Sequence, residues 1–421
     1  MYVLKAEIVN VKSIGYLTWS VPLEQAAGWH VVLGDNGSGK SSVLRAIGLA
    51  LVGHENALAL RLPLENWVRK GAKEAKADLS LYRHEDLDGS GALKAVGRQE
   101  PPHVDFNIIN TGNEQDVSQW RLGSNSLDRL AKGWFSAAYG PFRRFSGSDE
   151  QYDKISSRYP RLARHLSLFD ERFALTETLE WLRQLRFEQL EEGEQPGHLL
   201  DKVKAFVNEP DFLPFGAQLQ EISSKQVIFV DGNGCEVPVE ELSDGYRSIL
   251  SMTFELIRQL AREYGPETLF DQKDPSRIVA PGVVLVDEID AHLHPTWQRR
   301  VGPWFRKHFP NMQFIVTTHS PLVCQAAETG TVFRLAQPGS GEEPGMVTGN
   351  ELNRLLYGNI LDAYGTGLFG DGVTRSPESE KLLDRLAHLN LKEINEGLSR
   401  GEVQEQDKLR ATLPTAAYAF K

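Results

Sequence analysis

The chain has 421 residues, of which 41% are hydrophobic and 24% are charged, a balance that is ordinary for globular proteins. No apolar run approaches the roughly 20 residues of a membrane-spanning helix, and the first residues lack the pattern of a secretory signal, so we expect a cytoplasmic protein with no membrane partner. The formal net charge of −11 argues against a protein that coats nucleic acid through its overall field, although arginine clusters leave a local DNA contact open.

Strand and helix patterns alternate along the first part of the chain. Apolar residues at every second position predict strands within residues 1–33, the last of which is the run HVVL. A helix is predicted from Lys40 to Val52, and the runs KADLSLYR and VDFNII predict more strands. From Asp149 the pattern becomes helical. One apolar stripe of this helical segment is predicted to contain Leu175, Leu179, Leu182 and Phe187.

The second part of the chain predicts an α/β core followed by a helical hairpin. DGNG predicts a turn between two short strands, and a helix is predicted from Asp244 to about Tyr264. The strands PGVVLVDE and QFIVTTHS, with a helix after His294 between them, are of the buried type found in parallel sheets. Near the end, Ser376 as N-cap and Pro377 at the first helical position begin the predicted hairpin.

The stretch GDNGSGKSS, Gly34 to Ser42, carries the pattern G-x-x-x-x-G-K-S between a predicted strand and a predicted helix. Its glycines allow the backbone to curl so that successive N–H groups point at phosphate oxygens, and the helix N-terminus adds partial positive charge. Lys40 is expected to bridge the β and γ phosphates of a nucleotide, and Ser41 to give its hydroxyl to Mg²⁺. The predicted nucleotide-binding residues are Gly34, Asn36, Gly37, Ser38, Gly39, Lys40, Ser41 and Ser42.

Two further strand ends supply candidate catalytic groups. At the end of GVVLVDE, Asp287 is expected to reach the water shell of Mg²⁺, and Glu288 to act as general base on the attacking water. The next buried strand, QFIVTTHS, leads to His319, whose imidazole is expected to hydrogen-bond a γ-phosphate. The sequence therefore predicts a site that hydrolyses a nucleoside triphosphate.

The stretch LSDGYRS is a second candidate anion site, because Ser243, Asp244 and Gly245 stand at a predicted helix N-terminus. One chain rarely needs two phosphate cradles for one nucleotide. With this stretch included, the sequence resembles the ATP-binding-cassette class of P-loop ATPases, whose motifs follow the same order: GDNGSGKS, LSDGYRS, LVDEID, AHLHP and TTHS. The resemblance covers residues 1 to 335.

The resemblance implies an α/β fold, namely a P-loop ATPase head with a mixed β lobe and a parallel sheet with helices, plus a helical insertion and a C-terminal helical hairpin. It implies ATP and Mg²⁺ as ligands. It also implies a homodimer or higher even oligomer, in which the signature LSDGYRS of one subunit closes over the nucleotide of another, and it places Asp290 in the D-loop. The implied segments are an ATPase lobe at 1–148, a helical insertion at 149–215, a second lobe at 216–350 and a helical region at 351–421.

The distance between motifs narrows the class. Residues 42–241 separate the phosphate loop from the signature, which disfavours a transporter subunit, and this gap holds no sustained heptad run of a long coiled coil. The phrases AAYGPFRRF, VEELSDGYRS and DEIDAHLHPTWQ resemble the small ATPases of Septu-type and retron-associated phage defence systems, which implies control of a separate effector, a nuclease or toxin. No nuclease site is predicted in this chain. A DNA-binding ATPase of repair or recombination, of the RecF or Rad50 type, stays open as the alternative.

Two positions depart from the class pattern. Asp244 stands in the signature where the class has glycine, and the region where the class has its magnesium-sensing glutamine reads AAYGPFRR. In place of the glutamine, Arg143 or Arg144 is assigned a lid role, with its guanidinium on phosphate.

Overall fold

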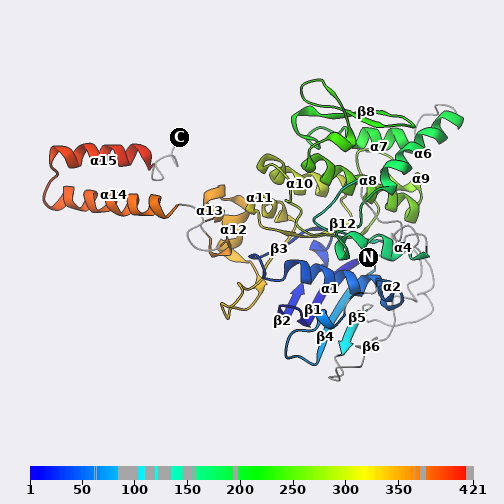
Figure 1. The fold of residues 1–421 in the computed structure, drawn as a ribbon, viewed down its shortest axis with the longest axis horizontal. Coiled ribbons are helices and arrows are strands. Elements are labelled where there is room, and N and C mark those ends of the chain that lie inside the picture. The colour runs from blue at the N-terminus through cyan, green and yellow to red at the C-terminus, as the bar shows by residue number, and fades with distance from the viewer. Residues whose placement is uncertain are drawn as a thin grey trace. The chain divides into compact units, whose positions relative to one another are not determined.

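A computed structural model of the chain describes residues 1–60, 62, 64–83, 103–109, 119–121, 134–145, 155, 158–192, 198–364, 366–369 and 376–413. It divides into two compact units, Met1–Tyr357 and Gly358–Lys421 (Figure 1). The first unit extends past the predicted boundary at 350 and includes helix α12 (Gly349–Tyr357). The predicted boundary at 148 lies outside the described residues.

The described strands of the first unit form three sheets. The largest has the order β14-β13-β3-β12-β11-β7, and its strands are parallel except for β14. Its strands are β3 (Gly28–Leu33), β7 (Ser136–Tyr139), β11 (Gly282–Val286), β12 (Met312–Thr318), β13 (Gly330–Arg334) and β14 (Gly345–Met346). An antiparallel sheet, in the order β2-β1-β4-β5-β6, contains β1 (Tyr2–Val11), β2 (Ile14–Ser20), β4 (Glu74–Tyr82), β5 (His103–Ile109) and β6 (Gln119–Arg121). A small antiparallel sheet contains β8 (Gln218–Ile222), β9 (Val227–Val230) and β10 (Glu236–Pro238).

Helix α1 (Lys40–Val52) lies between the two larger sheets. It contacts β1, β4 and β5 of the antiparallel sheet and β11 and β12 of the parallel sheet (Figure 1). Buried apolar residues occur on every side of this helix: Val43, Leu44, Ala46, Ile47, Leu49, Ala50, Leu51 and Val52. A helix that is apolar all round is stable only when both sides are covered. This packing holds the N-terminus of α1, and with it the phosphate loop, in one place.

The other helices of the first unit are distributed over both halves of the chain. They are α2 (His54–Leu58), α4 (Pro160–Ala163), α5 (Leu166–Phe169), α6 (Glu177–Glu192), α7 (Leu199–Val207), α8 (Asp244–Tyr264), α9 (Pro266–Leu269), α10 (Pro295–His308) and α11 (Pro321–Cys324). Single-turn 3-10 helices occur at Leu23–Gln25, Leu64–Trp67, Pro214–Gly216, Val239–Glu241 and Gln325–Glu328. No helix in the described parts of the chain combines the length and apolar composition needed to cross a membrane.

Helix α6, which lies in the predicted helical insertion, packs on α8, the helix that begins at the signature stretch. Arg258 of α8 is ion-paired with Glu177 of α6 at 2.8 Å, and Thr178 donates a hydrogen bond to Glu255 of α8 at 2.8 Å. The predicted stripe is wrong at Phe187, which is 59% exposed. The other three predicted members, Leu175, Leu179 and Leu182, are buried. Leu185, which was not predicted, is buried as well.

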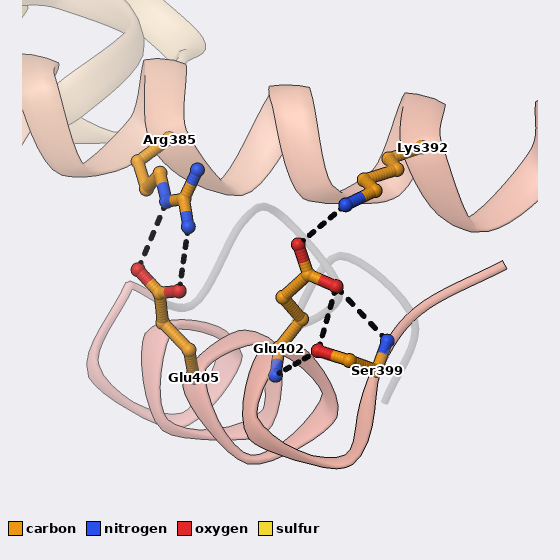
Figure 2. A network of polar contacts seen from close by, with 5 residues as sticks. All are labelled: Arg385, Lys392, Ser399, Glu402 and Glu405. Atoms are coloured by element: carbon orange, nitrogen blue, oxygen red, sulfur yellow. Dashed lines mark hydrogen bonds and ion pairs between the residues drawn. The ribbon is translucent and has the colours of Figure 1, made fainter. Parts of the chain in front are cut away.

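The second unit contains α13 (Ile360–Tyr364), a 3-10 turn (Gly367–Phe369), α14 (Pro377–Asn395) and α15 (Arg400–Thr412). Helices α14 and α15 form the predicted hairpin, and Ser376 is the N-cap of α14, accepting from Ser379 N–H at 3.2 Å. Four leucines form its small core: Leu386, Leu389, Leu409 and Leu413. Figure 2 shows the polar contacts that join its helices, a bidentate Arg385–Glu405 pair and a bond from Lys392 to Glu402, which lowers the Glu402 pKa to about 2.

Candidate functional site

The sheet order brings the predicted site residues to one edge. Strand β12 lies between β3 and β11, and Val316 of β12 is level with Val31 and Val286. The phosphate loop follows β3, His319 follows β12, and the carboxylate pair follows β11. Because the three strands are parallel, these groups lie at the same edge of the sheet. The carboxyl edge of a parallel sheet is where ligands bind in open α/β folds.

The phosphate loop has the curled backbone that its glycines predict. Gly37 and Gly39 have φ values of 80° and 101°, in the region that favours glycine, and a Cβ on Gly39 would lie 2.8 Å from Ser13 Oγ. Helix α1 starts at Lys40, so its first backbone N–H groups, including that of Ser41, have no carbonyl one turn before them. Donors of this kind are what an N-terminal anion site requires.

The ammonium of Lys40 lies over the loop itself. Its Nζ donates to the carbonyls of Gly34 at 2.8 Å and Asp35 at 3.0 Å. Burial lowers its pKa, and nearby carboxylates, first Glu288 and then Asp287, oppose that shift. The carboxylates after β11 therefore lie close enough to the phosphate-loop lysine to act on its charge.

Two threonines of β12 orient the acidic side chains. Thr317 Oγ1 donates to Asp287 Oδ1 at 2.6 Å and accepts from Glu288 N–H at 2.7 Å. Thr318 Oγ1 donates to Asp290 Oδ1 at 2.6 Å. Sequence reasoning missed these threonines, although the pair TT directly before His319 was visible as two polar residues ending a buried strand.

His319 faces the same group of charges. Burial lowers its pKa, the positive charge of Lys40 lowers it further, and the carboxylates of Asp290 and Glu288 oppose the change. The imidazole is therefore neutral at pH 7, with one nitrogen able to donate and the other to accept.

The oxygen ligands available here fit magnesium. Asp287 is 1% exposed, and its charge acts on Lys40, the first residue of α1; Ser41 is the second. Mg²⁺ prefers carboxylate, hydroxyl and phosphate oxygens and keeps several waters. Ser41 and Asp287 would hold it, as predicted from the motifs.

The signature stretch forms the N-terminus of α8. Ser243 is the N-cap but makes no side-chain capping bond, and it is exposed, so its hydroxyl is available to a ligand. Asp244, which stands where the class has glycine, forms an ion pair with Arg247, and the guanidinium offsets the charge of its carboxylate. Gly245 is required by a close approach, because a Cβ there would lie 2.7 Å from the carbonyl oxygen of His292 in the D-loop.

The structure contradicts the predicted phosphate contact of Arg143. This side chain is 3% exposed, and all of its N–H groups point at acceptors within the protein. Arg144 is exposed and makes a long contact of 3.4 Å with the carbonyl of Glu171, so its lid role stays a prediction.

A hollow of about 810 Å³ adjoins the phosphate loop at Gly37 and Ser38. Strand β2 lines it with Tyr16, which is 60% exposed, and the segment after β13 lines it with Gln337. Arg69 completes the wall and donates to Ser13 O at 3.1 Å. An aromatic face and polar groups beside a phosphate cradle suit the base and ribose of a nucleotide. Sequence reasoning missed this wall because its segments are far apart in the chain.

Comparison with known proteins agrees with this geometry. A family described as "AAA domain, putative AbiEii toxin, Type IV TA system" matches residues 30–325. The chain belongs to this family. The AAA-domain match runs from β3 to the end of α11, and so contains the phosphate loop, the signature, the carboxylate pair and His319.

Two relatives of this AAA-domain chain carry the names of a Septu protein and a retron ATPase. It is 29% identical over 344 residues to the "Septu protein PtuA" of Bacillus mycoides (strain KBAB4), which covers 80% of this chain and 40% of the relative. It is 37% identical over 124 residues to the "Retron Ec83 probable ATPase" of Escherichia coli, which covers 30% of this chain and 22% of that protein. The chain thus spans less than half the length of either relative. The resemblance to Septu and retron ATPases is confirmed.

A solved structure shows the same fold. The head described as "Crystal structure of the SmcHead bound to the C-winged helix domain of ScpA" superposes with a TM-score of 0.50 at 18% identity, over 83% of this chain and 99% of that one. The predicted fold, a P-loop ATPase head of the ATP-binding-cassette type, is confirmed.

Proposed function

We propose that this chain is a Mg²⁺-dependent ATPase. One observation carries the proposal: Lys40, Asp287, Glu288 and His319 come together at the carboxyl edge of the parallel sheet. The two carboxylates oppose the lowering of the Lys40 pKa, and the charge of Lys40 lowers the pKa of His319. A P-loop lysine, a metal-binding aspartate and an adjacent glutamate are the groups that phosphoryl transfer from ATP to water requires.

Each group has a role that its position supports. Lys40 leaves the carbonyls of Gly34 and Asp35 and binds the β and γ phosphates, while the N–H groups at the start of α1 hold the phosphate oxygens. Glu288 accepts a proton from the attacking water, and neutral His319 donates a hydrogen bond to the γ-phosphate. Ser41 and Asp287 would hold Mg²⁺, which would supply positive charge to the β and γ phosphate oxygens.

The complete site is proposed to form between two subunits. The N-terminus of α8, with an uncapped Ser243, is a second anion-binding end, and it packs on the D-loop through Gly245. In a two-fold dimer, the signature of one subunit then closes over ATP bound by the other, and Asp290 lies at the contact.

The biological role is proposed from the relatives. The named Septu and retron relatives suggest that ATP binding and hydrolysis here control a separate effector protein, a nuclease or toxin, in a cytoplasmic anti-phage system. A duplex-DNA-binding ATPase is the second candidate, and the basic face of α10 is the observation that favours it. Arg299 and Lys307 of α10 are exposed and line a hollow of about 550 Å³ with Arg300.

The test begins with phosphate release from ATP by the purified chain, with and without Mg²⁺. The parent protein should hydrolyse ATP only with Mg²⁺, and Lys40→Ala should not hydrolyse it. The control Lys225→Ala, which changes an exposed lysine between β8 and β9, should behave like the parent. A parent protein that binds ATP without releasing phosphate overturns the ATPase proposal. Cells that express the parent chain together with its neighbouring gene should resist phage infection. Cells that express the Lys40→Ala chain with the same gene should be infected. Tight, ATP-dependent binding of duplex DNA that Arg299→Glu abolishes, without any partner, would favour the second candidate.

A further inference from the structure

Arg143 occupies a buried position behind the candidate site. It follows β7, the strand that pairs with β11 on the side away from the phosphate loop. Its Nε donates to Ser248 Oγ at 2.8 Å, and its Nη1 to the carbonyls of Gly140 at 3.0 Å and Asp287 at 2.8 Å. Its Nη2 donates to the carbonyls of Glu288 at 3.1 Å and Ile289 at 3.5 Å. One guanidinium therefore joins three segments: the end of β7, the turn after β11 and helix α8.

The turn after β11 needs such a partner. Three consecutive carbonyls, those of residues 287–289, converge on the guanidinium, and their partial negative charges would repel one another without a cation between them. Glu288 also has a φ of 46°, in the left-handed region that costs a residue with a side chain free energy. Arg143 stabilises this conformation from the carbonyl side, and Thr317 stabilises it through Glu288 N–H.

The guanidinium remains charged in this setting. Burial lowers the pKa of Arg143 to about 10, and the carboxylates of Asp287, Asp290 and Glu288 oppose the shift. Lysine could keep the charge, but its ammonium cannot reproduce the fixed fork of five N–H donors.

The bond to Ser248 connects the turn with the signature. Ser248 is 1% exposed and lies three residues after Gly245, one turn into α8. Since α8 is a continuous helix of 21 residues, a displacement of its N-terminus reaches Ser248 within the same rigid element.

We propose that Arg143 is a positioning residue that sets the conformation of Glu288 and couples it to the signature helix. When the N-terminus of α8 binds a phosphate held by the partner subunit, α8 shifts, and the Ser248–Arg143 hydrogen bond moves the guanidinium that holds the carbonyls around Glu288. Hydrolysis is thereby favoured in the closed dimer. This inference rests on the proposed ATPase function.

The test uses a mild change and a matched control on the same helix. Ser248→Ala removes only the bond between α8 and Arg143, and Ser248→Thr restores a hydroxyl. Ser251→Ala is the control, because Ser251 is also buried in α8 and its hydroxyl donates to the carbonyl of Ser248 on the same helix. We expect kcat to fall about five-fold in Ser248→Ala with KM and ATP affinity unchanged, to recover in Ser248→Thr, and to stay at the parental value in Ser251→Ala.

Arg143→Lys should lower kcat by about ten-fold or more, because the general base loses its fixed position. If Arg143 acts through Glu288, adding Arg143→Lys to Glu288→Gln should cost less than about two-fold in the remaining hydrolysis. Effects that multiply in the double variant overturn the proposal, as does a Ser248→Ala protein that matches Ser251→Ala. Thermal unfolding shows whether each variant is folded, and if Arg143→Lys is not, the Ser248 series decides. A parent protein without hydrolysis would instead reject the proposed function.

Discussion

The substitution Glu288→Gln tests the assignment of the general base. The backbone of this residue is held without its side chain, since its N–H donates to Thr317 Oγ1 at 2.7 Å and its carbonyl accepts from Arg143 at 3.1 Å. Glutamine has the same shape, so the turn should be preserved. Its amide cannot accept a proton from water, and hydrolysis should fall by about 10²–10⁴-fold, the usual contribution of a general base. In activation free energy this is about 3–5 kcal/mol.

The same substitution should strengthen ATP binding. Glu288 is the carboxylate with the largest effect on the pKa of Lys40, so its charge lies close to the phosphate site. Removing one negative charge beside a triphosphate relieves about 1 kcal/mol of repulsion even at the dielectric constant of water, which is ~five-fold in affinity. The trapped species should be an ATP-bound dimer.

The assay for Glu288→Gln is single-turnover hydrolysis together with equilibrium ATP binding. Glu267→Gln, at an exposed position in α9, serves as the control for the loss of one charge. A variant that binds ATP and hydrolyses it within about three-fold of the parental rate would refute the assignment, because a general base contributes far more. His319 would then be the next candidate.

Further predictions concern the phosphate site, the shared site and pH. Lys40→Ala should abolish ATP binding measured at equilibrium, because the ammonium is the main cation facing the phosphates; unchanged affinity would contradict it. The variants Lys40→Ala and Ser243→Glu should each be inactive alone. Mixing them should restore hydrolysis, because each mixed dimer holds one intact composite site. Mixed dimers that are detected by mass measurement but are inactive would refute a shared site. Burial lowers the pKa of His30 to about 4 and that of His165 to about 3, from 6.5. The unfolded chain thus binds more protons below pH 6.5, and each histidine should reduce the free energy of unfolding by about 2 kcal/mol between pH 7 and pH 5. Urea unfolding at both pH values checks this, and His30→Asn should remove about half of the loss.

Several features could be predicted because they depend on neighbours in the sequence. Helix α8 has the predicted bounds, Asp244 to Tyr264, and α1 begins at Lys40 as the phosphate-loop pattern requires. Caps, turn residues and apolar periodicity are local properties, so they can be read along the chain. The predicted stripe failed at Phe187 because the direction of a side chain depends on which helices pack around it.

The sequence by itself determined which chemical groups are present: a phosphate loop, a carboxylate pair after a buried strand, and a histidine after the next one. Only the tertiary structure decided how they are held. Nothing in GPFRRF distinguishes Arg143 from Arg144, yet pairing of β7 with β11 places one guanidinium behind the Glu288 turn and leaves the other exposed. The same pairing of distant strands sets Thr317 beside Asp287. Strand order is a non-local property, fixed by burial of whole sheet faces and not by any short stretch of residues.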